Sequence, residues 1–325
     1  MKAAIWTKYG PAEGIELHDI EKPLPKQNEI LVKVVASTVS TGDIEMRTMK
    51  VPLGLGLFMR LFTGILKPKR IKTLGQEFSG IVEKVGENVK KFKIGDEVFG
   101  TTGPMMGANA EYITLPEASN DALVGIKPTN LSYIEAAALP LGSLEAYYFL
   151  MKAEIAKGQS IVINGAGGTI GTFAVQLAKH YDVEVTAVDS FEKLEMLASI
   201  GADHLIDYKK ENFTNNGKKY DVIFDVPGKT DFSKSVKSLK QNGHYLIANP
   251  KFRYLLKGIW TSWTTDKNVF FWSVDRNPDD LLLMKKLAEQ EKVRPVIDKV
   301  YPLEKIVEAH KYVESGVKRG NVVIN

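Results

Sequence analysis

A glycine-rich stretch near the middle of the chain has the residue types and setting of a phosphate-binding turn. The apolar run 160–164 before it is typical of a buried strand, and the pattern of 169–180 after it is typical of an amphipathic helix. Glycine permits a tight bend and close backbone approach, while a helix N-terminus offers N–H groups and a positive dipole end. We therefore predict that a dinucleotide binds here through its pyrophosphate. The predicted contact residues are Gly165, Gly167, Gly168, Thr169, Ile170 and Gly171.

The spacing of these glycines is not the strict Gly-x-Gly-x-x-Gly pattern. It is Gly-x-x-Gly-x-x-Gly, because position 170 is Ile. A plain structural turn is therefore the alternative interpretation. The strand–turn–helix setting, together with Asp189 after the next predicted strand at 183–188, favours nucleotide binding.

The residues after that second strand bear on the choice of cofactor. A carboxylate at Asp189 can accept hydrogen bonds from the ribose hydroxyls and repel a 2′-phosphate, which favours NADH. Ser190, Lys193 and Tyr208 favour NADPH instead, because donors and a cation can hold that phosphate. Glu192 adds negative charge to the same region. We expect NAD(P)H as the cofactor, with the choice open and local charge favouring NADH, although each side chain can also be solvated helix surface.

The elements that would hold this site alternate between strand and helix from residue 160 onward. Near-continuous apolar strands separated by helices indicate a parallel sheet covered on both faces. Residues 1–120 read mostly as β structure, and Ser132 with Glu135 forms a capping-box pattern before a helix that extends towards Met151. The further predicted strands are 30–35, 78–85, 96–100, 204–207, 221–225, 245–248, 269–272 and 321–324, and the further predicted helices are 191–200 and 306–314.

The length of 325 residues suits two domains. We expect an α/β protein in which residues 1–125 and 276–325 form a β-rich domain that holds both termini. Residues 126–275 would form a doubly wound domain inserted between these two parts.

Composition excludes several classes of protein. The net charge of +4 is too dilute for a nucleic-acid surface, and the absence of cysteine excludes disulfides, thiolate metal sites and cysteine nucleophiles. No apolar run reaches the roughly 18–20 residues of a membrane span. The first residues also lack the apolar core of a signal peptide. We therefore expect a cytoplasmic protein with no integral membrane segment and no nucleic-acid partner.

Several blocks in order along the chain resemble one family. The blocks are 30–34, 75–86, 89–100, 110–113, 136–141, the glycine turn and 197–208. In these the sequence resembles the medium-chain dehydrogenase/reductase superfamily, in its zinc-free NAD(P)H:quinone oxidoreductase branch. The resemblance implies a GroES-like catalytic domain and a Rossmann domain, with substrate and nicotinamide in the cleft between them.

Zinc-dependent relatives bind the metal through an early Cys, the His of a Gly-His-Glu segment and a later Cys or acidic residue. This chain has Ser40 near the first position and Gln76 between Gly75 and Glu77. Its five histidines are scattered along the sequence. We therefore expect no zinc and no other metal.

The resemblance also places the substrate pocket. In that branch an Asn and an Asp, three residues apart, border the pocket, and Ser40 and Asp43 stand in their place. Ser40, the backbone N–H groups near Ser143, and Asn249 are candidate donors to the substrate carbonyl, whereas Asp43 can instead be a loop cap. Glu145 replaces a Thr that is common near the nicotinamide, and is either helix surface or an altered carboxamide contact.

Three apolar segments remain outside the site. Residues 51–66, followed by the cationic stretch 67–70, are interpreted as a structural lobe that forms a wall for an apolar substrate; contact with a membrane surface is the weaker idea. Residues 251–263 mix aromatics with cations, as a nucleic-acid surface would. We interpret them instead as a helix packed under the Rossmann domain. Residues 269–274 predict an apolar edge strand and, as in the resembling family, a homodimer.

These inferences combine into one predicted function. The chain would transfer a hydride, without zinc, from NAD(P)H to a small apolar quinone or α,β-unsaturated carbonyl. Two alternatives stay open: an alkenal or enoyl reductase of the same fold, and a non-catalytic NAD(P)-binding sensor.

Overall fold

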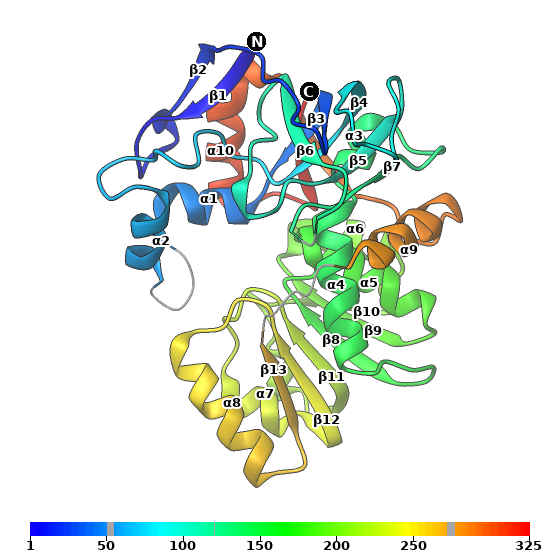
Figure 1. Ribbon diagram of the computed structural model, residues 1–325. Helices are drawn as coiled ribbons and strands as arrows, with labels where there is room; N and C mark the ends of the chain where they lie inside the picture. Colours follow the sequence, from blue (N-terminus) through cyan, green and yellow to red (C-terminus); the bar gives the residue numbers. More distant parts are fainter. Residues whose placement is uncertain (51–54, 120, 272–276) are drawn as a thin grey trace. The chain divides into compact units, whose positions relative to one another are not determined.

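The computed structural model describes residues 1–50, 55–119, 121–271 and 277–325. Contacts divide the chain into two compact units. The first comprises Met1–Leu144 with Arg276–Asn325, and the second comprises Glu145–Asp275. We call these the β-rich unit and the parallel-sheet unit, and Figure 1 shows the elements of each.

The β-rich unit is built around one long strand, β3 (Glu29–Val39). It pairs in antiparallel fashion with β4, β6 and β15, within a seven-stranded sheet of order β14-β15-β3-β4-β5-β7 that has β6 beside β3. A separate antiparallel pair is formed by β1 and β2. The bounds of the other strands are β1 (Lys2–Trp6), β2 (Ile15–Asp19), β4 (Glu77–Val85), β5 (Glu97–Thr101), β6 (Tyr112–Pro116), β7 (Val124–Ile126), β14 (Ile297–Tyr301) and β15 (Asn321–Ile324).

The β-rich unit also contains helices. They are α1 (Thr41–Thr48), α2 (Gly56–Thr63), α3 (Tyr133–Ala137), α9 (Pro278–Glu289) and α10 (Ile306–Glu314), with α4 (Pro140–Lys152) starting in this unit. The predicted capping box is confirmed, because Ser132 Oγ accepts from the Glu135 N–H and the Glu135 carboxylate accepts from the Ser132 N–H. The single helix predicted there is in fact two, since Pro140 cannot donate the hydrogen bond that would continue the first.

The β-rich unit extends further along the chain than the predicted boundary at residue 125. Helix α3 packs on β3 and β4. The Glu135 carboxylate at its start forms an ion pair with Arg294 at 2.6 Å, which ties it to the C-terminal part of the same unit. Residues 126–144 therefore contact the β-rich unit.

The parallel-sheet unit contains six strands in the order β10-β9-β8-β11-β12-β13, and every neighbouring pair is parallel. The predicted doubly wound sheet is confirmed. Its strands are β8 (Ser160–Asn164), β9 (Glu184–Asp189), β10 (His204–Asp207), β11 (Tyr220–Asp225), β12 (Leu239–Ile247) and β13 (Asn268–Phe271). Its helices are α5 (Thr169–His180), α6 (Phe191–Ser199), α7 (Phe232–Lys237) and α8 (Phe252–Thr264).

The last helix and strand of this unit only partly match their predictions. Helix α8 does pack beside β13, as Figure 1 shows, through the buried residues Tyr254, Gly258 and Thr261. Its other aromatic side chains, however, point to solvent, because Trp260 and Trp263 are 70% and 86% exposed. Strand β13 is the last strand of the sheet, and the remainder of the predicted strand, 272–274, lies outside the described residues.

No helix in the described ranges is both long enough and apolar enough to cross a membrane.

Candidate cofactor site and its supports

At the centre of the parallel sheet, between β8 and β11, the order in which the chain adds strands reverses. From β8 it proceeds outward through β9 to β10, and from β11 it proceeds the other way to β13. Ligands of such sheets bind beyond the carboxyl ends of the strands at this switch point. The two strand ends are joined here, since the Asn164 Nδ2 donates to Asp225 Oδ1 at 2.8 Å.

Asp225 is a fully buried anchor that the sequence reasoning missed. Its second oxygen accepts from the N–H and the hydroxyl of Thr230 at 3.0 and 2.6 Å, and the Tyr245 hydroxyl lies 3.3 Å away. Burial and the Asp225 charge raise the pKa of Tyr245. The signal in the sequence was a polar residue at the end of two apolar strands, Asn164 and Asp225.

The glycine turn fits between β8 and its neighbours because two positions carry no side chain. Gly165 has a φ of +78°, a region that other residues rarely adopt. A Cβ at Gly167 would lie 2.5 Å from Lys193 Cδ and 3.0 Å from Asp189 Oδ2. The turn therefore approaches the residues after β9 as closely as its backbone allows.

Helix α5 begins directly after this turn, as predicted. Its N-cap, Gly168, is extended and makes no side-chain cap bond, and the helix starts at Thr169. The first N–H groups of any helix lack partners within the helix, so they are available to an anion. Gly167 and Gly171 lie buried, while the other predicted contact residues are partly exposed. The turn, the uncapped helix end and the switch point together fit a dinucleotide pyrophosphate.

Asp189 and Lys193, which the sequence set against each other, are partners in the structure. Both side chains are buried, and Lys193 Nζ lies 3.3 Å from Asp189 Oδ1. Asp189 also accepts from the backbone N–H groups of Gly167 and Ser190, each at 2.8 Å. Oδ2 thus supports the glycine turn from within the protein, while Oδ1 binds Ser190 and Lys193 at the start of α6. Asp189 is therefore tied to the backbone and to Lys193, and its predicted contact with the ribose stays a prediction.

The other predicted cofactor residues lie at the same carboxyl edge of the sheet. Ser190 is the N-cap of α6 and is partly exposed. Tyr208 follows β10, donates its backbone N–H to the Asp189 carbonyl at 3.1 Å, and exposes its side chain. Asn249 follows β12, and its Nδ2 donates to the Val226 carbonyl at 3.0 Å, so its amide holds the loop after β11.

Ser40 and Asp43 form a capping box at the start of α1 in the β-rich unit. Ser40 Oγ donates to Asp43 Oδ2 at 2.7 Å and accepts from the Asp43 N–H at 3.2 Å. Asp43 also accepts from the N–H groups of Ser40 and Gly75, each at 2.8 Å. Burial raises the pKa of the Asp43 carboxyl, and these hydrogen bonds oppose that effect. The single hydroxyl hydrogen of Ser40 is therefore directed at Asp43. This arrangement agrees with the interpretation of the pair as a helix cap.

Two further residues near this cap were missed. Glu77 is buried and accepts from Thr38 Oγ1 at 2.7 Å and from the Leu141 N–H at 2.8 Å, so it joins β3 and β4 to the start of α4. Glu45, on α1, is half-buried, and burial raises its pKa to about 7. The signal for Glu77 was an acidic residue at the beginning of an apolar strand; Glu45 gave no signal.

The hydrogen-bond donors of Ser143 are already used within the protein. The Ser143 N–H and hydroxyl both donate to the Leu139 carbonyl, at 3.4 and 2.6 Å, within the first turn of α4. The side chain is fully buried. Glu145 lies in the same helix and is partly exposed.

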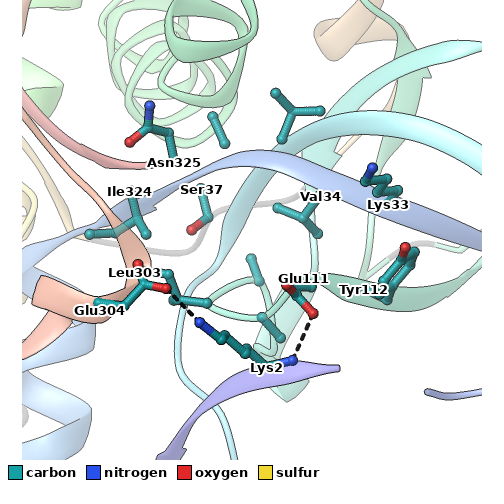
Figure 2. Close-up of a pocket in the computed structure, with 14 residues that line it drawn as sticks. Lys2, Lys33, Val34, Ser37, Glu111, Tyr112, Leu303, Glu304, Ile324 and Asn325 are labelled. Atoms are coloured by element: carbon teal, nitrogen blue, oxygen red, sulfur yellow. Dashed lines mark hydrogen bonds and ion pairs between the residues drawn. The ribbon is translucent and has the colours of Figure 1, made fainter. Parts of the chain in front are cut away.

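A pocket of about 370 Å³ lies in the β-rich unit (Figure 2). Its rim holds both signs of charge: Lys2 Nζ pairs with Glu304 at 2.9 Å, and the Lys2 N–H donates to Glu111 at 2.7 Å. None of the site residues predicted from the sequence lines this pocket. Across the described ranges, no group of three or more His, Cys, Asp or Glu residues is arranged to hold a metal ion.

The geometry defines a two-unit α/β protein with a glycine turn that fits a dinucleotide pyrophosphate, and comparison with known proteins agrees in fold. Residues 26–129 match the family described as alcohol dehydrogenase GroES-like domain, and residues 200–324 match the family described as zinc-binding dehydrogenase. The 2-methylene-furan-3-one reductase of Solanum lycopersicum is 35% identical over 342 residues, which cover 100% of this chain and 79% of that protein.

Two more relatives extend this comparison. The chloroplastic NADPH-dependent alkenal/one oxidoreductase of Arabidopsis thaliana is 34% identical, with 100% of this chain and 79% of that protein covered. The structure of the quinone oxidoreductase from Coxiella burnetii superposes with a TM-score of 0.87 at 27% identity, over 100% of this chain and 98% of that one. The chain belongs to the medium-chain dehydrogenase/reductase superfamily, in its quinone-oxidoreductase-like branch. It is an NAD(P)H-dependent oxidoreductase, and the predicted family, fold class and type of cofactor are confirmed.

Proposed function

We propose that this chain reduces the carbon–carbon double bond of an apolar α,β-unsaturated ketone or aldehyde, with NADPH as the hydride donor. The observation that carries the proposal is the glycine turn at the uncapped end of α5, which fits a dinucleotide. The two relatives at 35% and 34% identity are named for reducing a methylene-furanone and alkenals or alkenones, which share this conjugated group.

The protein's part in this reaction is alignment. When bound, reduced nicotinamide supplies the hydride for the β-carbon of the acceptor, and water supplies the proton for the α-carbon. The start of α5 binds the pyrophosphate, and Asp189, paired with Lys193 of α6, holds the turn by accepting from the Gly167 N–H. The Ser40–Asp43 cap acts as a positioning pair that fixes the start of α1, and neither residue transfers a proton.

The choice of NADPH follows from the environment of Asp189. Lys193 neutralises its charge and two N–H groups occupy its oxygens, so it repels a 2′-phosphate less than an open carboxylate would. Ser190 and Tyr208 supply hydroxyl donors at the same edge. We expect kcat/KM to be higher with NADPH than with NADH, and Tyr208→Phe combined with Ser190→Ala to reduce that ratio while leaving the NADH rate unchanged.

Quinones are the second candidate acceptors, because the quinone oxidoreductase of Coxiella burnetii shares the fold over the whole chain. We propose that neither reaction needs zinc, since the sequence has no cysteine and Gln76 stands beside Glu77. Steady-state oxidation of NADPH with an enone and with 9,10-phenanthrenequinone, with and without a chelator, tests these points. A loss of activity with the chelator would contradict the zinc-free mechanism.

The same measurement separates an enzyme from a sensor. Tight NADPH binding, seen as a change in nicotinamide fluorescence, without oxidation by any acceptor would favour a non-catalytic NADPH-binding protein. Failure to bind either cofactor would overturn the proposal altogether.

We further propose a homodimer that pairs through β13. This strand ends the sheet, and among the described residues its outer edge has no partner strand. An apolar strand edge favours pairing with a second copy. Light scattering after size exclusion tests this, and a monomer at micromolar concentration would contradict it.

A further inference from the structure

Helix α8 presents one face of apolar side chains to solvent. The positions recur at the spacing of a single helical face and are each more than half exposed. We call them the outer face of α8: Phe252, Leu256, Ile259, Trp260 and Trp263. The opposite side of the helix packs on β13 through Tyr254, Gly258 and Thr261. Contiguous exposed apolar patches of this kind mark surfaces that bind another protein or a membrane.

The charge around this face is strongly one-sided. The segment 250–265 contains three Lys or Arg residues and no acidic residue, although the whole chain carries a net charge of just +4. The cations Lys251, Arg253 and Lys257 lie exposed on or beside α8, which has no acidic residue of its own. Asp266, just after the helix, is paired with Lys267 at 2.9 Å.

We propose that the outer face of α8 binds the surface of an anionic lipid bilayer. The apolar side chains would enter the boundary between headgroups and acyl chains, while the flanking cations contact lipid phosphates. Tryptophan side chains favour this interfacial depth, and α8 ends with two of them, Trp260 and Trp263. At 13 residues, or about 20 Å, the helix is too short to span a bilayer and lies along its surface.

A second copy of the chain fits this face less well than a lipid surface. In a two-fold symmetric dimer the same patch contacts itself. The cations Lys251, Arg253 and Lys257 of both copies would then be gathered at one interface, with no acid on either helix. Lipid phosphates supply the negative charge that such an interface lacks.

The β-rich unit carries the same combination independently. Helix α2 exposes Leu57, Phe58 and Leu61, which are 74%, 67% and 62% exposed. The sequence between Arg47 and Glu77 contains six Lys or Arg residues and no acidic residue. Two helices from separate units thus share an apolar face with cations and without acids, which supports a lipid surface as the common partner.

The test uses the full-length protein and vesicles of phosphatidylcholine, with or without phosphatidylglycerol. Binding is measured by co-sedimentation and by quenching of tryptophan fluorescence with brominated lipid. Leu256→Ser should weaken binding to the mixed vesicles about tenfold, from the loss of one buried leucine. Leu282→Ser on α9 is the matched control, because the two leucines are 65% and 61% exposed and α9 begins with two acidic residues.

The charge contribution is tested separately. Replacing both Lys251 and Lys257 with Gln should weaken binding to mixed vesicles about thirtyfold and leave any binding to pure phosphatidylcholine unchanged. NADPH binding by every variant is measured as a control for folding, and it also keeps this result independent of the proposed reductase activity.

Two outcomes would overturn the proposal. The first is equal vesicle binding by wild-type protein, Leu256→Ser and Leu282→Ser. The second is a lower oligomeric mass of Leu256→Ser in light scattering, with vesicle binding unchanged. That result would identify the outer face of α8 as a subunit interface.

Discussion

His310 should make the protein progressively less stable as the pH falls below 6.5. It lies on α10 with no exposed surface, and neither ring nitrogen has a hydrogen-bond partner among the described atoms. Burial, and then the charge of Arg47, lower its pKa to about 3. Arg47 is itself buried and held by Glu314, whose Oε2 lies 2.5 Å from its Nη2, so its charge stays beside the ring.

The sign and size of the effect follow from proton binding. Between the unfolded pKa of 6.5 and the folded value of about 3, only the unfolded chain binds the proton, so the free energy of unfolding falls as the pH falls. At pH 5 the loss from this one group is about 2 kcal/mol, and each further pH unit down to 3 removes about 1.4 kcal/mol more.

His310→Leu removes the titrating group while keeping an apolar side chain in the core. Urea denaturation at pH 8 and at pH 5 gives the free energies of unfolding. We expect the wild-type protein to lose about 2 kcal/mol more than the variant between these two values. His180→Leu, at an exposed position, is the control for the loss of an imidazole. Equal losses in wild-type protein and His310→Leu would refute the reasoning.

The remaining predictions concern the turn, α1 and α2. Gly167→Ala should raise the KM for NADPH about tenfold, because its Cβ would displace the Asp189–Lys193 pair. Gly168→Ala is the control and should leave the KM unchanged, because its Cβ meets nothing closer than 3.5 Å. Equal KM values for the two variants would contradict the packing argument. Burial raises the pKa of Glu45 to about 7, so the native state favours its protonated form and stability is lost as pH rises from 4.5 through 7. Glu45→Gln should therefore stabilise the protein by about 3 kcal/mol at pH 8 and little at pH 4, as melting temperatures would show. Replacing Leu57 and Phe58 with Ser should raise the KM of apolar acceptors in steady-state assays without lipid, and an unchanged KM would dismiss α2 as a substrate wall.

The parallel sheet could be predicted from sequence because its strands are short apolar runs bounded by turn residues. Strands 160–164 and 204–207 and helix 169–180 have the predicted bounds. Helix α1 was missed because its first residues were interpreted for pocket chemistry, although the same Ser40–Asp43 pair is a capping box. The pattern of a cap and the pattern of a polar pocket are the same in sequence, and only burial separates them.

Within the candidate site, local features were predictable and long-range contacts were not. The turn at Gly165–Gly171 follows from the residue types alone. The Glu77 contact with Leu141 joins residues 64 positions apart, and no local pattern encodes it. The charges of Asp189 and Lys193 are plain in the sequence, but their burial as a pair beside the turn is not. They were therefore interpreted as opposing cofactor contacts, whereas the structure joins them in one ion pair.

That ion pair constrains how cofactor preference can change during evolution or by design. Replacing Asp189 alone would remove an acid from the carboxyl edge of the sheet, but it would also leave Lys193 buried without this partner and withdraw the acceptor of the Gly167 N–H. An unpaired buried charge destabilises the folded state, so a single substitution at Asp189 would lower the amount of folded protein before it altered cofactor selectivity. The two positions are therefore expected to be epistatic: a library that varies them together would reach altered selectivity, and one that varies either alone would not.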